Sequence, residues 1–288
     1  MTPPADQASD SSSFTMYEPV VEPELLRKMM KDGIYGIGGQ YAILMQFAHP
    51  GLARGSAEHS DFASRILNRL KTTTRYLIVA VYGTREEKEA IFSIVHRSHS
   101  MVKGDGYFAD DPELHKWTAA TLFMSLVAVH EAFIGKMSEY TKRTLYKETA
   151  IFATSLRMPP EMWPKTYEDF CEYWNHNVET LQITHWARDL ARALMYPKGI
   201  PLVLKPALPF ARLITASFLP DRIRRDYGCL PDPNNRRTIL DMTVGAIALS
   251  HMLAPPFVRN IPHYYYKRNM KKAVKRIKAT GSWVKTRG

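Results

Sequence analysis

The sequence is short of cysteine and contains no long uncharged apolar run. Cys171 and Cys229 are the only cysteines, so the chain has no CxxC pair, no covalent haem-attachment motif and no disulfide framework, and a reducing compartment is expected. The longest apolar stretch, residues 119–135, is interrupted by His130 and Glu131, which argues against a transmembrane helix. The first residues lack the basic and apolar regions of a secretory signal. A cytoplasmic location is the resulting expectation.

The short motifs of the commonest nucleotide-dependent and hydrolytic enzymes are also missing. The sequence contains no GxGxxG before a helix, no Walker A motif, no GxSxG and no HExxH. Residues 36–39 are rich in glycine, but they follow a predicted helix rather than a strand. A bend is therefore favoured there over a phosphate-binding loop. Without these motifs, the sequence offers few candidates for a catalytic site.

Charge is distributed unevenly along the chain, whose formal net charge is +11. Residues 1–24 contain five acidic residues and no basic one, whereas residues 259–288 contain ten basic residues and no acidic one. The acidic segment 1–22 is rich in serine and proline and is predicted to be disordered. Residues 259–288 are predicted to form a basic amphipathic tail, appended to the main domain.

Three interpretations of this tail are open. Met270, Val274 and Ile277 recur at helical spacing among lysines and arginines, and Trp283 follows them. Such a helix can lie on an anionic membrane surface, which would make the protein peripheral on the cytosolic face of a membrane. The stripe can equally well dock onto the body of the protein. Nucleic acid is not expected as a partner, because the body lacks a basic patch interleaved with aromatic residues.

Helical periodicity predicts an all-α fold, with a single multi-helix domain over residues 23–258. Thr84 and Glu87 form a predicted capping box, which begins a helix that runs to about Gly104. Asp111 followed by Pro112 predicts another helix start. Alternating β patterns are scarce. Further helices are predicted at about 25–30, 41–48, 66–83, 166 onward, 185–196, 209–217 and 236–253.

His99 is the residue of greatest chemical interest in this pattern. It shares one face of the helix that starts after Thr84 with Phe92 and Val102. His96 lies three residues earlier and His115 on the next predicted helix, so a shared metal ion is conceivable. The alternative is a hydrogen-bonded histidine in the core, and spacing alone favours this alternative.

A series of short motifs in a particular order shifts that balance toward a functional histidine. The series includes Gln46-x-x-His49-Pro50, Arg69-x-x-x-Thr73-x-Arg75, Val95-x-x-x-His99-x-x-Val102-x-Gly104, Asp111-Pro112-Glu113-Leu114-x-x-Trp117 and Tyr227-Gly228. It resembles the domain-of-unknown-function 2236 family, over about residues 25–230. That family includes the catalytic domain of latex-clearing rubber oxygenases and the fungal mycophenolic-acid-pathway oxygenase. The resemblance implies an all-α fold like the latex-clearing protein core, enclosing a non-covalent b-type haem.

The resemblance also assigns roles to individual residues. His99 stands at the position of the proximal haem ligand of the rubber oxygenases, so it is expected to bind the iron. Arg69 and Thr73 match an arginine and a threonine four residues apart, which places them on one helix face. Arg69 is expected to donate to a haem propionate or to bound oxygen, and Thr73 to the oxygen. His96 replaces an arginine, and two roles are equally open for it: contact with a propionate or an acidic group of the substrate, or a position on the surface.

Two positions depart from the family pattern. Thr72 stands where the rubber oxygenases have a lysine that is able to cap the iron, so a lysine-capped resting state is not expected. Ala119 stands where many members have a histidine, within a Trp-x-His-Ala-Thr segment. A second active-site histidine at that position is therefore lost from this chain.

The function that the resemblance implies is a haem-dependent oxygenase with O₂ as co-substrate. Its substrate is expected to be an apolar small molecule, and its reaction to include cleavage of a C=C bond in an isoprenoid or terpenoid–polyketide intermediate. Two alternatives stay open, a non-enzymatic haem or lipid carrier at membranes and a non-haem metal hydrolase that uses His96, His99 and His115. A visible spectrum separates a haem protein from the non-haem hydrolase, because only a bound haem gives a Soret band.

Overall fold

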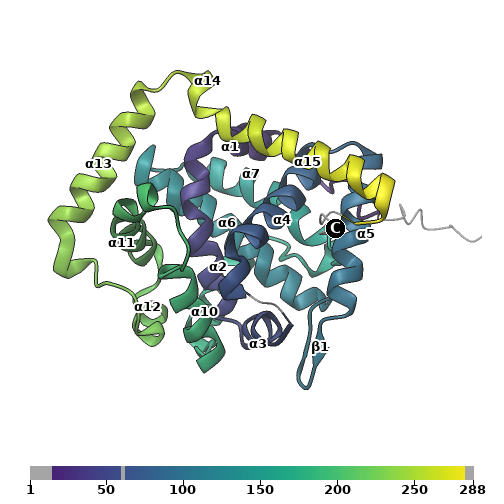
Figure 1. The fold of residues 1–288 in the computed structure, drawn as a ribbon, viewed down its shortest axis with the longest axis horizontal. Coiled ribbons are helices and arrows are strands. Elements are labelled where there is room, and N and C mark those ends of the chain that lie inside the picture. Colours follow the sequence, from purple (N-terminus) through teal and green to yellow (C-terminus); the bar gives the residue numbers. More distant parts are fainter. Residues whose placement is uncertain (1–14, 60–61, 283–288) are drawn as a thin grey trace, which may run out of the picture.

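The structure, a computed structural model, describes residues 15–59 and 62–282, without the side chains of residues 62–68. It is all-α as predicted, with a central helix α6 surrounded by other helices (Figure 1). The first helices are α1 (Glu24–Lys31), η1 (Gly33–Gly38), α2 (Gly39–Phe47), α3 (Pro50–His59), α4 (Phe62–Tyr82), α5 (Arg85–Ser100), α6 (Pro112–Phe133), α7 (Glu139–Thr149) and α8 (Ile151–Thr154). They are followed by η2 (Pro160–Met162), α9 (Tyr167–Thr180), α10 (His185–Met195), η3 (Leu202–Ala207), α11 (Leu208–Phe218), α12 (Asp221–Tyr227), η4 (Asn234–Arg236), α13 (Arg237–Leu253), α14 (Pro256–Arg259) and α15 (Ile261–Thr280).

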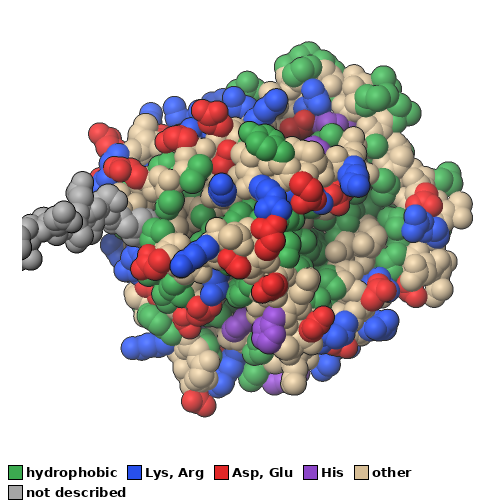
Figure 2. Space-filling view, turned by 180° about the vertical axis from the view of Figure 1, so that it is seen from behind, with side chains coloured by type: hydrophobic (Ala, Val, Ile, Leu, Met, Phe, Trp, Pro, Cys, Tyr) green, Lys and Arg blue, Asp and Glu red, His purple; other side chains and the backbone are tan. Residues whose placement is uncertain are grey.

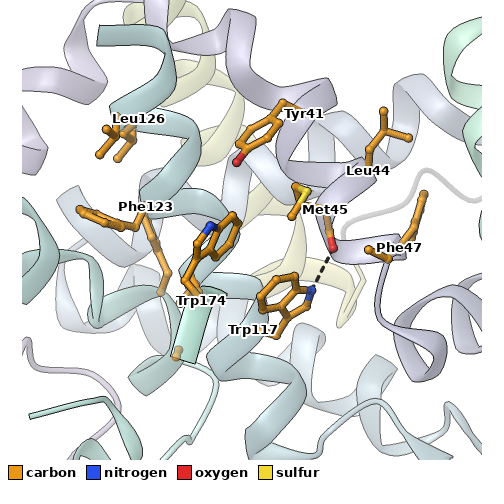
Figure 3. Close-up of a cluster of buried hydrophobic side chains, with 14 of the residues drawn as sticks. Tyr41, Leu44, Met45, Phe47, Trp117, Phe123, Leu126 and Trp174 are labelled. Carbon is orange, nitrogen blue, oxygen red and sulfur yellow. Dashed lines mark hydrogen bonds between the residues drawn. The ribbon is translucent and has the colours of Figure 1, made fainter. Parts of the chain in front are cut away.

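Helix α6 is central because its sequence is apolar on nearly every side, and a helix of that kind must be covered all round. The side chain of Asp111 caps its first turn by accepting from the backbone N–H of Glu113 at 2.9 Å. In the middle of the core, the Trp117 ring nitrogen donates to the carbonyl of Met45 at 2.9 Å (Figure 3). The same ring stacks on Trp174, with 5.1 Å between ring centroids. These contacts fix α6 against α2 and α9.

The capping box that begins α5 is confirmed. The Thr84 side chain accepts from the backbone N–H of Glu87 at 3.3 Å, and the Glu87 carboxylate accepts from the backbone N–H of Thr84 at 3.1 Å. The helix ends at Ser100, however, a few residues before the predicted end at Gly104.

A short antiparallel hairpin of β1 (Lys103–Gly104) and β2 (Tyr107–Phe108) follows α5. Gly106, with φ of 77°, supplies the backbone conformation that its turn requires. Strands of two residues are too short to show alternation in a sequence, so the prediction missed them. The hairpin matters because it brings the end of α5 beside the start of α6.

The stripe of the basic tail is docked onto the domain. Met270, Val274 and Ile277 on α15 are buried among apolar residues of α4 and α5. Two polar contacts fix the same helix, from Arg75 to the Asn269 side chain at 2.7 Å and from Lys278 to Glu86 at 2.8 Å. The docked alternative of the sequence analysis is therefore the one that the structure shows. Trp283 and the acidic residues before residue 15 lie outside the described residues.

Candidate functional site

His99 lies in the last turn of α5, and its side chain is half-buried. Its Nδ1 atom is buried and has no hydrogen-bond partner among the described residues. Burial, together with the nearby His115, His96 and Arg69, lowers the pKa of His99 to about 3. The imidazole is therefore neutral at physiological pH, which is the form that binds a metal.

His115, in the first turns of α6, faces His99 with 5.8 Å between the ring centroids. Because a carbonyl can only accept, the Nε2–H of His115 donates to the carbonyl of Ala109 at 3.1 Å. This bond fixes the tautomer and leaves a lone pair on Nδ1, which is buried without a partner among the described residues. A histidine whose second nitrogen donates to a backbone carbonyl is typical of metal ligands.

Asp110 completes a group of three residues, which we call the His99–Asp110–His115 cluster. One nitrogen of each histidine and one oxygen of the aspartate all lie within 4.8 Å of one another. The two oxygens of Asp110 differ, because Oδ2 pairs with the Arg157 guanidinium, whereas Oδ1 is buried, accepts no hydrogen bond in the described part of the chain and lies 3.8 Å from Nε2 of His115. Arg157 has a φ of 73°, which is uncommon for a residue other than glycine.

Each member of the cluster thus has one buried polar atom without a hydrogen-bond partner among the described residues. Two histidines and one carboxylate form a donor set that suits iron(II), and also zinc. Buried polar atoms normally have partners. A cation bound by one atom of each residue would give the cluster a partner.

His115 lies one turn before position 119, where the family's histidine is lost. The two positions are four residues apart on α6, so they lie on the same face, one turn from each other. His115 was a candidate in the sequence analysis, whereas Asp110 was missed. Asp110 belongs to no sequence motif, and only the hairpin β1–β2 brings it to His99.

The other predicted site residues, Arg69, Thr73 and His96, lie in different surroundings. Arg69 on α4 is partly buried, donates to the Ser56 hydroxyl at 3.4 Å and lies close enough to lower the pKa of His99. Burial also lowers the pKa of Arg69 itself. Thr73, one turn later, has an exposed side chain. His96 has a buried Nε2 without a partner among the described residues, but it is not part of the cluster.

Acidification is expected to reduce the free energy of unfolding. The pKa of His99 is about 3 in the folded protein and 6.5 in its ordinary state, so the unfolded chain binds a proton that the folded chain does not once the pH falls below 6.5. Burial lowers the pKa of His115 in the same direction. Urea titrations of the apo-protein from neutral pH to about pH 4 measure this effect. His99→Gln should show a shallower pH dependence than the wild type, and an equal slope would contradict the assignment.

Comparison with known proteins gives a match over residues 27–249 to the family described as ER-bound oxygenase mpaB/B'/rubber oxygenase, catalytic domain. The chain belongs to this family. The membership confirms the resemblance that the motifs indicated, and it places the protein among oxygenases.

Two curated relatives are the uncharacterized proteins Rv2237 of Mycobacterium tuberculosis and Mb2261 of Mycobacterium bovis. Each is 31% identical over 192 residues, which make up 63% of this chain and 75% of the relative. No solved structure matches the chain. Among the described residues, no helix has the length and apolar character needed to cross a bilayer.

Proposed function

We propose that the protein is a haem-dependent oxygenase that oxidises an apolar small molecule with O₂, with His99 as the ligand of the haem b iron. The observation that carries this proposal is the buried, unpartnered Nδ1 of a neutral imidazole at the family position of the proximal ligand. A haem iron would give this nitrogen the partner that it lacks among the described residues. When bound, the haem supplies the activation of oxygen.

The chain's own residues have three tasks under this proposal. His99 offers a lone pair that burial keeps unprotonated. The Arg69 guanidinium, held near His99 in a poorly solvated position, suits a propionate or a developing negative charge. The apolar side chains around α5 and α6 keep water away from the reacting atoms.

The proposed substrate is an isoprenoid or a terpenoid–polyketide intermediate, and the proposed reaction is scission of an alkene. In that reaction both atoms of O₂ enter the products, and the C=C bond is replaced by two carbonyl groups. The support for an apolar substrate is the family's inclusion of rubber oxygenases.

A second candidate is favoured by the His99–Asp110–His115 cluster itself. Two histidines and one carboxylate are the protein ligands of many non-haem iron(II) oxygenases. Under this alternative the iron is held by the three side chains directly, and Arg157 orients Asp110 through its second oxygen. The non-haem hydrolase of the sequence analysis would use the same metal site, with Asp110 in place of His96.

Metal analysis and a visible spectrum of the purified protein separate these candidates, with His115→Gln and Asp110→Asn as variants. A haem protein should show a Soret band and stoichiometric haem that both variants retain, since under this proposal His99, and neither of these two residues, would hold the haem iron. A cluster site should hold stoichiometric iron without a Soret band, and both variants should lose that iron. A protein that contains neither haem nor metal, and takes up neither on reconstitution, would overturn both candidates and leave the carrier of lipids as the remaining alternative.

A further inference from the structure

Helix α13 has apolar residues on both of its faces, although it lies at the outside of the molecule. Its inner face packs Leu240, Val244 and Ile247 into a small cluster with residues of α6 and α11. Its outer face presents Ile239, Met242, Leu249, Met252 and Leu253 to solvent. Met242 is 70% exposed and Leu253 71%. A helix that is apolar all round is normally buried or in contact with lipid.

The exposed apolar surface continues beyond α13. Phe257 and Val258 on α14 and Ile261 and Tyr264 at the start of α15 are exposed as well. Hydrophobic side chains project along the top and right-hand edge of Figure 2, where α13 and α14 lie after the half turn from Figure 1. Soluble monomers seldom expose an apolar patch of this extent without a use for it. We call residues 239–264 on these helices the α13–α14 surface.

A cationic groove adjoins this surface on α15. It has a volume of about 380 Å³ and shares Tyr264 with the apolar patch; its other lining residues are Lys267, Arg268, Lys271, Lys272 and Lys275. The sequence contains no acidic residue after Asp241, so no carboxylate of the α14–α15 segment neutralises the groove from within. The combination of exposed apolar side chains, tyrosines and clustered bases has the chemistry of a lipid-facing surface.

We propose that the α13–α14 surface and the adjoining groove dock on an anionic phospholipid bilayer. The apolar side chains of α13 and α14 enter the boundary between headgroups and acyl chains, and the groove binds headgroup phosphates. A second copy of the chain is the less favourable occupant, because a two-fold contact would place the cationic groove of one copy close to that of the other. Docking uses residues other than the stripe of Met270, Val274 and Ile277, which is buried.

The proposal does not depend on which iron group the site holds. Docking on a bilayer would give a short route to the protein for an apolar substrate that is dissolved in the membrane. The site at His99 lies on other helices, so loss of docking and loss of iron are separate observations.

Vesicle co-sedimentation of the full chain tests this proposal, with phosphatidylcholine vesicles alone and with phosphatidylserine added. The wild type should bind the anionic vesicles, and added salt should weaken the binding. Arg268→Glu/Lys271→Glu/Lys272→Glu should reduce the partition coefficient about a hundredfold. The matched control Lys103→Glu/Lys147→Glu/Lys165→Glu makes the same charge change on exposed lysines of other segments and should stay within about threefold of the wild type, because screening limits the range of charge effects.

The contribution of the apolar side chains to vesicle binding is tested with the triple variant Met242→Ser/Leu249→Ser/Leu253→Ser. These side chains are exposed, so the variant should keep the wild-type melting temperature while it loses vesicle binding. The proposal is overturned if the wild type does not bind anionic vesicles, or if the control variant loses as much binding as the groove variant. It is also overturned if the serine variant turns a dimer into a monomer and leaves vesicle binding unchanged, since the surface would then join two copies.

Discussion

His99→Ala is expected to purify as a folded protein that lacks stoichiometric iron and has lost nearly all oxygenase activity. The alanine removes the imidazole that both the haem and the cluster interpretations use, and whose Nδ1 has no competing partner among the described residues. Haem content, total iron and far-ultraviolet circular dichroism together measure this outcome. No other single change should affect turnover as much.

His176→Ala is the matched control, because His176 is an exposed histidine on α9. It should keep the iron content, the spectrum and the activity of the wild type. If His99→Ala instead retained wild-type iron and activity, His99 would be a core histidine, and neither the haem nor the cluster proposal would stand.

Arg69→Ala is expected to keep the iron and to lower kcat by about 10²–10³, the effect of removing one charged donor from a poorly solvated site. The guanidinium is partly buried beside His99, where poor solvation strengthens the electrostatic effect of its charge. Steady-state oxygen consumption with an alkene substrate measures kcat. The iron content of the same preparation shows whether any loss lies in turnover or in cofactor binding.

Arg85→Ala is the control for Arg69, because Arg85 is an exposed arginine that pairs with Glu89 on the surface of α5. Its kcat should equal that of the wild type. Thr73→Ala is informative in the same assay, since the family pattern gives Thr73 a role while the structure leaves its side chain exposed. An unchanged kcat in Arg69→Ala would remove Arg69 from the active site.

Most of the helices could be predicted because their signals are local. The capping box at Thr84 and the Asp111–Pro112 pair mark helix starts through bonds within one turn, and both are confirmed. The exposed outer face of α13 could not be predicted. Apolar residues on both faces of a helix indicate burial in a sequence, and only the packing shows that one face remains uncovered.

The candidate site could be predicted only in part, because a sequence motif is also a local signal. A family motif located His99, but it says nothing about which other side chains meet that ring in this chain. Asp110 meets it only because the hairpin at residues 103–108 folds α5 back toward α6. Thr73 was predicted to belong to the site, but its side chain is exposed in the structure. Its four-residue spacing places it on the helix face of Arg69, but spacing alone does not establish that this face is covered.

The packing of α15 on α4 and α5 has a consequence for the order of events during synthesis. Arg75 and its partner Asn269 are 194 positions apart in the chain. The helices that carry Arg69 and His99 therefore leave the ribosome long before the segment that covers their apolar side. Until that segment arrives, the nascent domain exposes Ile78, Ile91 and their neighbours to solvent, and exposed apolar surface of this kind attracts chaperones and promotes aggregation.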